Sequence, residues 1–518
     1  AIEIATKSVI TFRNISFDRC QTNDNGGAIL FNPPLTQRLL ASEQEYTITN
    51  CTFKDCGAAK GGSIYISSGV NKVDIEDTTF DGGTSKEEGI AIFINNNVQS
   101  FEIDSSVKFI NQNCNDKFLI SSAAVKSEIK NVRIENTVAG SGIKGIRLYN
   151  GDITIDNVFF HQSISSIEID SSVKSALIQN CIFSDNYYLS GNDYIGQVVL
   201  ISNKKCTFTN NIINFTSNTK AISALYVKSH GDIEISHNKF FKMANSLGGK
   251  THTAGAINIK EEAGANEQGT VRFNYNTIEE VGNVKNSLFY IVKRQPFNID
   301  HNYIKNCKIN DYLCNIDVSN NNQLGKELIL TNLTLIDCES HAQSGGGLGI
   351  WLVFTGKEGK FALQSCRFER NYAGLDTKSN GGCGGALEIG GASTFATELL
   401  FDDCDFIENT AEYYGGAIAI RTSKQALIRN CRFESNEAKK GGGAVYVYPH
   451  SSGLPKVTIS ETSFTHNKDT SFSNGHALYF QARPGSSTEL VIDQKCLFVD
   501  NGILDMERIY NRFKRATI

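Results

Sequence analysis

The chain has 518 residues, of which 40% are hydrophobic and 20% are charged, and its formal net charge is −5. This small charge gives no argument for nucleic acid as a partner, and no apolar run reaches the roughly 18 residues of a membrane-spanning helix. The 45 glycines, against 6 prolines, favour short strands joined by tight corners. The chain begins at Ala1 without a methionine, which we interpret as a mature form or a fragment.

Two copies of one short unit occur near the start of the chain. Phe17 is followed by the run Gly26-Gly-Ala-Ile-Leu30, and Phe53 is followed by Gly61-Gly-Ser-Ile-Tyr-Ile66. Apolar and polar residues alternate in these runs, as they do in a strand with one buried face. We therefore expect each glycine pair to lead the backbone into a strand. A phosphate-binding loop is not expected, because no helix follows.

Weaker copies continue through the middle of the chain in the same phase. Each contains one large apolar residue, which we call the anchor, and most anchors are separated by about 23 to 38 residues, the range of a solenoid repeat. The weaker anchors are Phe80, Phe109, Ile134, Phe160, Phe183, Phe208, Phe240, Ile278, Ile304 and Leu335. This spacing predicts one solenoid rather than several globular domains.

The clearest copies lie between residues 366 and 447. Phe368, Phe406 and Phe433 each follow a cysteine by two residues and precede an asparagine by three residues. The core anchors that we expect with most weight are Phe17, Phe53, Phe183, Phe368, Phe406, Phe433, Phe464 and Phe498. We expect the corner asparagines to stack on successive turns as a hydrogen-bonded ladder of Asn371, Asn409, Asn436 and Asn467.

The pattern predicts an all-β fold. Three short strands per turn, with no helical period between them, are typical of a single-stranded right-handed parallel β-helix of the pectin-lyase-like kind. We expect about 17 turns over residues 1–501. Residues 502–518 follow as a cap or tail, and apolar residues from Ile503 to Phe513 recur at helical spacing, which predicts a short capping helix.

The 14 cysteines include no CxxC pair, which argues against a zinc ribbon. Seven of them are expected to be small buried thiols, two residues before an anchor: Cys51, Cys181, Cys206, Cys366, Cys404, Cys431 and Cys496. Cys20 and Cys56 instead take the corner place of asparagine on adjacent turns, as do Cys307 and Cys338. Turns about 4.8 Å apart permit a disulfide in each pair. We predict no metal site, no cofactor and no catalytic residue.

Four sequons permit N-glycosylation if the protein is secreted. They begin at Asn14, Asn50, Asn214 and Asn332.

The tandem of Phe-x-x-Asn and Gly-Gly-Ala-Ile resembles the repeat of the polymorphic outer membrane protein family. It is clear at residues 366–447 and looser at residues 14–66, 183–211 and 464–480. Members of that family are autotransported bacterial adhesins with β-helical passengers, and related repeats occur in surface proteins of protists. The resemblance implies adhesion at a surface.

Three functions remain open at this level. The first, which we favour, is a non-enzymatic adhesion or interaction rod, extracellular or at the cell surface, with proteins or glycans as partners. The second is a structural subunit of an extracellular filament or coat, formed by end-to-end self-association. The third is a polysaccharide lyase or hydrolase, although the motif sets of polygalacturonases and pectate lyases are absent from the sequence.

Overall fold

The computed structural model divides into two compact units. Unit 1 comprises Ala1–Met243 and Glu262–Gly269, and unit 2 comprises Ala244–Glu261 and Thr270–Ile518. The structure describes residues 2–5, 8–33, 44–112, 117–135, 143–185, 196–202, 205–214, 223–229, 231–243, 257–261, 269–282, 289–292, 297–309, 314–317, 327–341, 348–351, 359–374, 382–390, 397–420, 424–448, 456–471, 475–481, 489–501 and 516–517.

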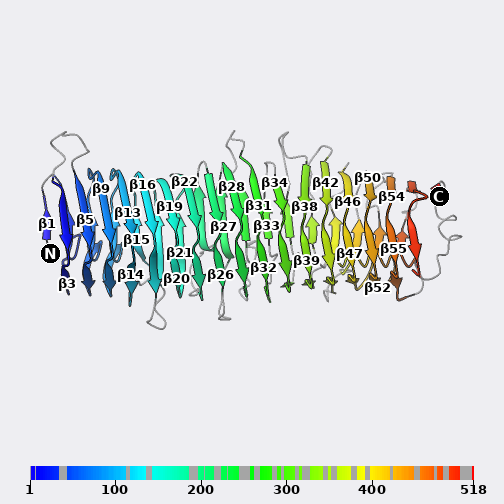
Figure 1. Cartoon of the computed structure of the whole chain (residues 1–518), viewed down its shortest axis with the longest axis horizontal. Helices are drawn as coiled ribbons and strands as arrows, with labels where there is room; N and C mark the ends of the chain where they lie inside the picture. Colours follow the sequence, from blue (N-terminus) through cyan, green and yellow to red (C-terminus); the bar gives the residue numbers. More distant parts are fainter. Residues whose placement is uncertain are drawn as a thin grey trace. The chain divides into compact units, whose positions relative to one another are not determined.

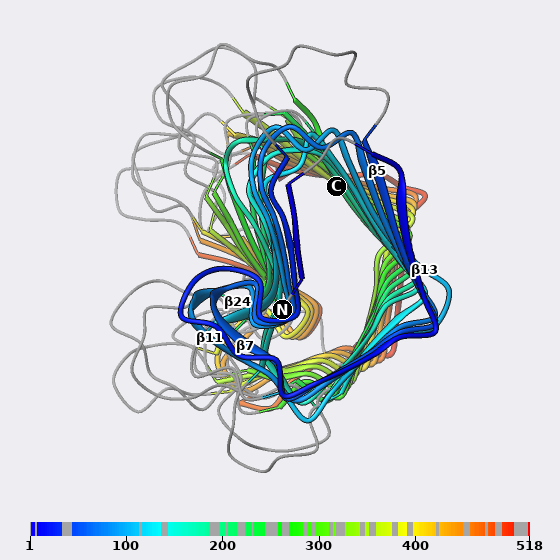
Figure 2. The ribbon, with the colours of Figure 1, turned by 90° about the vertical axis from the view of Figure 1, so that its left-hand side faces the viewer.

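Unit 1 is a stack of turns with three strands in each turn, and equivalent strands of successive turns pair in parallel to form sheets A, B and C (Figure 1). Sheet A contains β1 (Ile2–Ile4), β4 (Ile29–Phe31), β8 (Ile64–Ile66), β12 (Ile92–Ile94), β15 (Phe118–Ser122), β18 (Ile143–Leu148), β21 (Ser163–Ile169), β24 (Gly196–Ser202) and β27 (Ser223–Ser229). Sheet B contains β2 (Ile10–Arg13), β5 (Glu45–Thr49), β9 (Lys72–Glu76), β13 (Ser100–Asp104), β16 (Lys126–Lys130), β19 (Gly151–Asp156), β22 (Val173–Gln179), β25 (Lys205–Thr209) and β28 (Asp232–Ser236). Sheet C contains β3 (Ser16–Asp18), β6 (Thr52–Lys54), β10 (Thr79–Asp81), β14 (Val107–Ile110), β17 (Val132–Glu135), β20 (Phe159–His161), β23 (Ile182–Ser184), β26 (Ile212–Asn214) and β29 (Lys239–Phe241). Figure 2 shows the blue turns of unit 1 one behind another, and β5 and β13 of sheet B lie on the same side of these turns. Two further strands, β7 (Gly57–Lys60) and β11 (Thr84–Glu88), pair with each other. Each follows a strand of sheet C and precedes a strand of sheet A along the chain.

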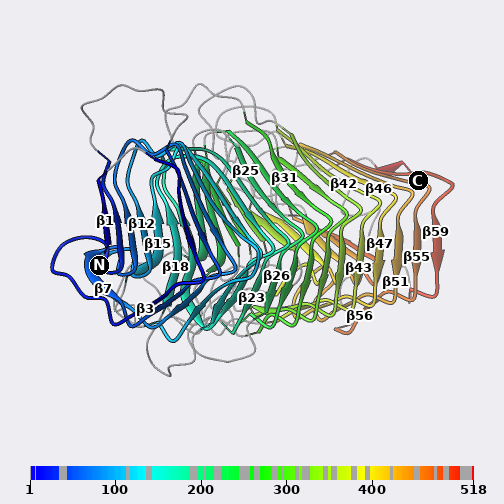
Figure 3. The same ribbon diagram turned by 60° about the vertical axis from the view of Figure 1, so that its left-hand side comes forward.

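Unit 2 repeats this plan and adds a sheet of two-residue strands after sheet C. Its sheet A strands are β30 (Ile257–Glu261), β33 (Phe289–Val292) and β37 (Cys314–Asp317). In the later turns, β41 (Leu348–Trp351), β45 (Leu387–Gly390), β49 (Ile418–Ile420), β53 (Val445–Val447) and β57 (Leu478–Phe480) form a separate five-stranded sheet, sheet G, at the equivalent place in the turn. Its sheet B strands are β31 (Val271–Asn274), β34 (Phe297–Asp300), β38 (Glu327–Thr331), β42 (Gly359–Gln364), β46 (Thr397–Asp402), β50 (Gln425–Arg429), β54 (Lys456–Ser460) and β58 (Glu489–Ile492). Its sheet C strands are β32 (Thr277–Glu279), β35 (Tyr303–Lys305), β39 (Thr334–Ile336), β43 (Arg367–Glu369), β47 (Asp405–Ile407), β51 (Arg432–Glu434), β55 (Ser463–Thr465) and β59 (Leu497–Val499). The added strands are β36 (Lys308–Ile309), β40 (Glu339–Ser340), β44 (Tyr372–Ala373), β48 (Thr410–Ala411), β52 (Glu437–Ala438) and β56 (Lys468–Asp469). In Figure 3, β42 and β46 of sheet B stand beside β43 and β47 of sheet C.

The anchors form the core of both units on the inner face of sheet C, as the repeat predicts. In unit 2, Phe368, Phe406 and Phe433 stack with ring centroids 5.1 and 4.8 Å apart, and Phe464 and Phe498 continue the stack. In unit 1, Phe17 and Phe53 stack at 4.8 Å. Parallel pairing in register places equivalent side chains directly above one another, so identical rings meet face to face.

One expected anchor was wrong. Phe208 lies on β25 of sheet B, where it pairs with Ile178 and Ile235. The anchor of that turn is Ile213 on β26, which pairs with Phe183 and is buried. Cys206, which we expected two places before an anchor, therefore belongs to sheet B as well.

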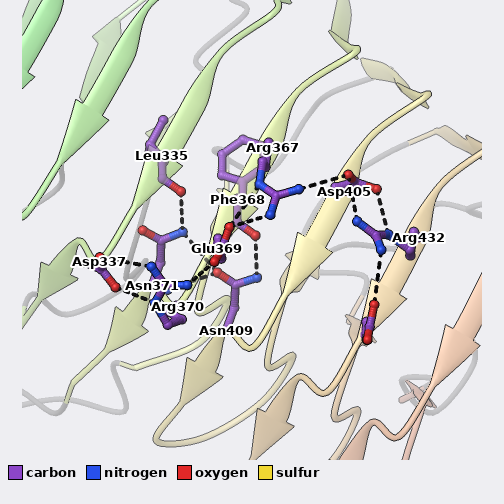
Figure 4. A network of polar contacts seen from close by, with 11 residues as sticks. Leu335, Asp337, Arg367, Phe368, Glu369, Arg370, Asn371, Asp405, Asn409 and Arg432 are labelled. Atoms are coloured by element: carbon purple, nitrogen blue, oxygen red, sulfur yellow. Dashed lines mark hydrogen bonds and ion pairs between the residues drawn. The ribbon is translucent and has the colours of Figure 1, made fainter.

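Asparagines occupy the buried corner after sheet C in unit 2. Asn371 donates to Asn409 Oδ1 from its backbone nitrogen at 3.1 Å and from its side chain at 3.0 Å, and its Nδ2 also donates to the carbonyl of Leu335 (Figure 4). The same pattern continues through Asn436 and Asn467. The ladder predicted from the sequence is therefore confirmed, and its role is to satisfy backbone groups that leave the sheet at the corner.

The glycine pairs are architectural. Gly415 has φ +67°, and a Cβ placed on it would lie 2.2 Å from the carbonyl oxygen of Ile418. A Cβ on Gly416 would lie 2.1 Å from the carbonyl oxygen of Gly443 on the next turn. Only glycine fits both positions.

The predicted capping helix at residues 502–513 lies outside the described residues. Later in the chain, β60 (Ala516–Thr517) pairs in parallel with β58 of sheet B. In the part of the chain that the structure describes, no helix is long and apolar enough to cross a membrane.

Candidate binding surface

The outer face of sheet A in unit 1 carries a row of aromatic and charged side chains. The residue between two inward apolar residues points outward on a strand, and register aligns Tyr65 with Phe93, Phe93 with Ser121, Ser121 with Arg147, and Arg147 with Glu168. We call this row, with its neighbours, the Arg147 surface. It comprises Tyr65, Phe93, Ser121, Arg147 and Glu168, with Glu88, Phe118 and Tyr149 beside them.

Two aromatic rings form one half of the Arg147 surface. Tyr65 and Phe93 are half-buried and stack with centroids 5.4 Å apart and an interplanar angle of 4°. The Lys60 Nζ lies 5.3 Å from the Phe93 ring centroid. Stacking covers one face of each ring, and the Tyr65 hydroxyl accepts a hydrogen bond from Asn95 at 3.3 Å.

The Arg147 guanidinium organises the other half. Its Nη1 donates to Glu88 Oε1 at 3.3 Å, and its Nε lies 2.9 Å from Glu168 Oε1. The other Glu88 oxygen accepts a hydrogen bond from the buried Ser121 hydroxyl at 2.7 Å. The Arg147 side chain is 29% exposed, so two carboxylates orient it while part of the side chain stays open to a ligand.

Aromatic rings support the same guanidinium. The Arg147 Cζ lies 4.8 Å from the centroid of the Tyr149 ring and 5.6 Å from that of Phe118. Lys144, which is 3% exposed, places its Nζ 5.5 Å from the Phe118 ring. Cations held over ring faces in this way gain electrostatic attraction at little cost in conformational freedom.

Burial governs the ionisation of the surface. Desolvation raises the pKa of Glu168 above its usual 4.5, against the opposing attraction of Arg147. Desolvation also raises the pKa of the Tyr149 hydroxyl, and the Glu88 charge adds to this effect. The Tyr149 phenol is therefore neutral at pH 7 and can donate a hydrogen bond. Carboxylate acceptors, guanidinium donors and phenol hydroxyls thus stand side by side.

None of the residues that the sequence singled out belongs to the Arg147 surface. Cys20 and Cys56 lie on adjacent turns as free thiols in contact, and burial raises the pKa of Cys56 to about 11. Cys307 and Cys338 are free thiols in the same relation. The predicted disulfides stay predictions.

The sequon asparagines lie at corners between sheets or at strand ends. Asn14 and Asn50 are exposed, and Asn50 Nδ2 donates to Asn14 Oδ1 at 2.7 Å. Asn332 is half-buried and donates to Asp300 at 3.1 Å. Asn214 ends β26, and the rest of its sequon lies outside the described residues. Glycosylation at these sites stays a prediction.

Sequence reasoning missed the Arg147 surface, although a signal for it was present. The expected strands contain an outward residue between two apolar ones, as in Ile64-Tyr-Ile66, Ile92-Phe-Ile94 and Ile167-Glu-Ile169. When the middle residues of these strands are compared in chain order, aromatic residues come first and charged residues follow. Among the described residues, no group of three or more histidine, cysteine, aspartate or glutamate side chains could hold a metal ion.

Comparison with known proteins agrees with this architecture. A family model described as the right-handed β-helix region matches residues 298–482. The chain is a right-handed parallel β-helix. Among solved structures, a mutant of the PL6 family alginate lyase AlyGC has a TM-score of 0.25 and 10% sequence identity, with 97% of this chain and 88% of that chain covered. A likeness this weak supports no conclusion about this chain. No curated protein sequence matches this β-helix.

Proposed function

We propose that this β-helix is a non-enzymatic adhesion or interaction protein, extracellular or at a cell surface, and that it binds glycans through the Arg147 surface. The observation that carries the proposal is the Arg147 guanidinium, oriented by Glu88 and Glu168 in the same outward row as the half-buried Tyr65–Phe93 pair, two turns from Phe93. The resemblance of the repeat to the polymorphic outer membrane protein family supports adhesion.

Sugar hydroxyls both donate and accept hydrogen bonds. Glu88 and Glu168 supply acceptors, Arg147 supplies forked donors, and Tyr149 supplies a phenol hydroxyl. Rigid aromatic residues and arginine are also the side chains that contribute most at binding surfaces. Because the row runs across successive turns, a linear polymer can contact several turns at once, which adds the contributions of weak individual contacts.

A polysaccharide hydrolase or lyase is the competing function, and one observation favours it. Glu168 has a raised pKa, as a general acid requires. However, hydrolysis needs two carboxylates that flank the scissile bond, and here both Glu88 and Glu168 face one guanidinium. This arrangement suits binding better than turnover.

Titration of the purified chain with defined oligosaccharides of cellulose, chitin, mannan, pectate and alginate tests the proposal. We expect saturable binding of at least one of them, without new reducing ends or unsaturated products above a heat-killed control. Saturation by none of these glycans would overturn the glycan proposal, and product formation would overturn the non-enzymatic part of it. End-to-end self-association stays a prediction, which light scattering at rising protein concentration tests.

A further inference from the structure

Three tyrosines stack beside sheet G, the five-stranded sheet of unit 2. Tyr446 and Tyr479 occupy equivalent places on β53 and β57, and Tyr414 lies beside them with Tyr413 and Tyr448 at the flanks. We call Tyr414, Tyr446 and Tyr479 the tyrosine stack. It packs over the small buried residues Cys383 and Ala419, and Tyr446 is only 5% exposed.

The rings are close enough to touch. The centroids of Tyr414 and Tyr446 are 4.5 Å apart with an interplanar angle of 20°. Tyr446 and Tyr479 are 5.5 Å apart, and Tyr414 and Tyr479 are 5.8 Å apart. The Tyr446 hydroxyl donates to Gln481 Oε1 at 2.9 Å, which fixes the central ring. The closest pair is thus nearer than the stacked phenylalanine anchors of the core, such as Phe406 and Phe433 at 4.8 Å.

We propose that the tyrosine stack is a site of oxidative cross-linking, in which Tyr414 and Tyr446 become joined by a carbon–carbon bond ortho to their hydroxyls. Each phenol gives one electron and one proton to a one-electron haem oxidant that is driven by hydrogen peroxide. The two phenoxyl radicals couple, and each ring then moves its ring-carbon hydrogen to oxygen and regains its phenol. The pair loses two hydrogens in total, and one hydrogen peroxide becomes two waters.

Proximity favours this coupling over reaction between chains. Two radicals held in contact by the fold meet without diffusion, and such preorganisation corresponds to a very high effective concentration. Tyr414 and Tyr479 are half-buried, which gives an oxidant access to them, and the buried Tyr446 loses its electron through these two rings, which it contacts. Burial also raises the pKa of Tyr414, so the phenol and not the phenolate is the form that is oxidised at pH 7.

The product would fasten neighbouring turns of the solenoid. A bond between residues 414 and 446 closes a long loop and restricts the unfolded chain, as a disulfide does. Neighbouring turns of a solenoid are otherwise held only by contacts with the next turn. A covalent link of this kind suits a protein outside the cell, where oxidants are available.

Treatment of the full chain with hydrogen peroxide and a haem peptide tests the inference. We expect blue dityrosine fluorescence and a cross-linked peptide pair containing Tyr414 and Tyr446, two hydrogens lighter than the sum, with a yield independent of protein concentration. Tyr446→Phe keeps the ring but cannot couple, so it should reduce the intrachain product several-fold.

Tyr275→Phe is the matched control. Tyr275 is 48% exposed, and its ring stacks on His301 rather than on a tyrosine, so this variant should cross-link like the wild type. Arg147→Lys should also cross-link normally, which separates this inference from glycan binding. An unchanged yield in Tyr446→Phe, products only between chains, or no dityrosine at all would overturn the proposal.

Discussion

The side-chain nitrogen of Asn409 donates to Asn436 Oδ1 at 3.0 Å, and the backbone nitrogen of Asn409 donates to the same oxygen at 3.0 Å. Asn409 Nδ2 also donates to the carbonyl of Phe368 at 3.0 Å (Figure 4). Both asparagines are fully buried. Each amide thus serves two turns, and the ladder pairs backbone groups at a corner where water has no access.

Replacement of Asn409 by leucine should destabilise unit 2 strongly. Leucine has a similar volume but leaves the Asn371 amide and the Phe368 carbonyl without partners, and each unsatisfied buried group costs about 1–3 kcal/mol. Denaturant unfolding followed by circular dichroism measures the loss. Asn430→Gly is the control, because Asn430 is exposed at a corner with φ +53°. Equal stability of the two variants would show that the ladder contributes nothing.

Phe406→Ala should cost about 3–5 kcal/mol, as is usual for an aromatic residue deleted from a packed core. Phe406 is fully buried between Phe368 and Phe433. The outward Phe159 is half-buried, so Phe159→Ala should cost much less. A loss below about 1 kcal/mol for Phe406→Ala in denaturant unfolding would contradict an inward anchor.

Asp402 should make stability depend on pH at the acid end. The hydrogen bond from Arg429 holds the pKa of Asp402 below its usual 3.8. A carboxyl whose folded pKa is depressed stabilises the protein above its unfolded pKa, and this stabilisation is lost as the pH falls through the folded value. Asp402→Asn should therefore melt below the wild type at about pH 6, and the gap should close towards about pH 2. Glu398→Gln, an exposed change in the same strand, controls for general charge effects. A gap that is constant with pH would refute this assignment.

Cys20 and Cys56 should form a disulfide when the chain is made in an oxidising compartment. The two thiols are already in contact, and Cys20 is half-buried and so within reach of an oxidant. Peptide mapping without reductant should yield the linked pair. Cys51, buried before the anchor Phe53, should remain a free thiol. Full alkylation of Cys20 and Cys56 without reductant would exclude the bond.

The sequence predicted the core better than the surface. The spacing of Phe406 and Asn409 recurs at Phe368 and Phe433 because these turns place an inward ring and a corner amide at the same positions, so a single chain reveals it. The prediction for Phe208 was wrong because Phe208-Thr-Asn-Asn211 has the same spacing as an anchor and its corner asparagine. Asn211 instead occupies the buried corner position before sheet C, which a cysteine such as Cys181 occupies in other turns.

The Arg147 surface could not be assembled in the same way. Glu88 and Arg147 are 59 residues apart and meet only after turns of unequal length are placed in register. The sequence shows which residues point outward but does not show which residues of neighbouring turns are aligned with one another. Pairing between strands, as between β18 and β21, supplies this information.

The binding constant of Arg147→Lys is the most direct test of the proposed function. Lysine keeps the charge but loses the forked donors that bind carboxylates and hydroxyls together. Arg133→Lys is the matched control on sheet C, because Arg133 also pairs with a glutamate, Glu135, and lies 4.6 Å from the Phe159 ring centroid. With the oligosaccharide that the wild type binds best, we predict about a ten-fold weaker Kd for Arg147→Lys, since one charged hydrogen bond contributes about 1.5 kcal/mol or more, and an unchanged Kd for Arg133→Lys. Equal affinities for all three proteins would contradict the account.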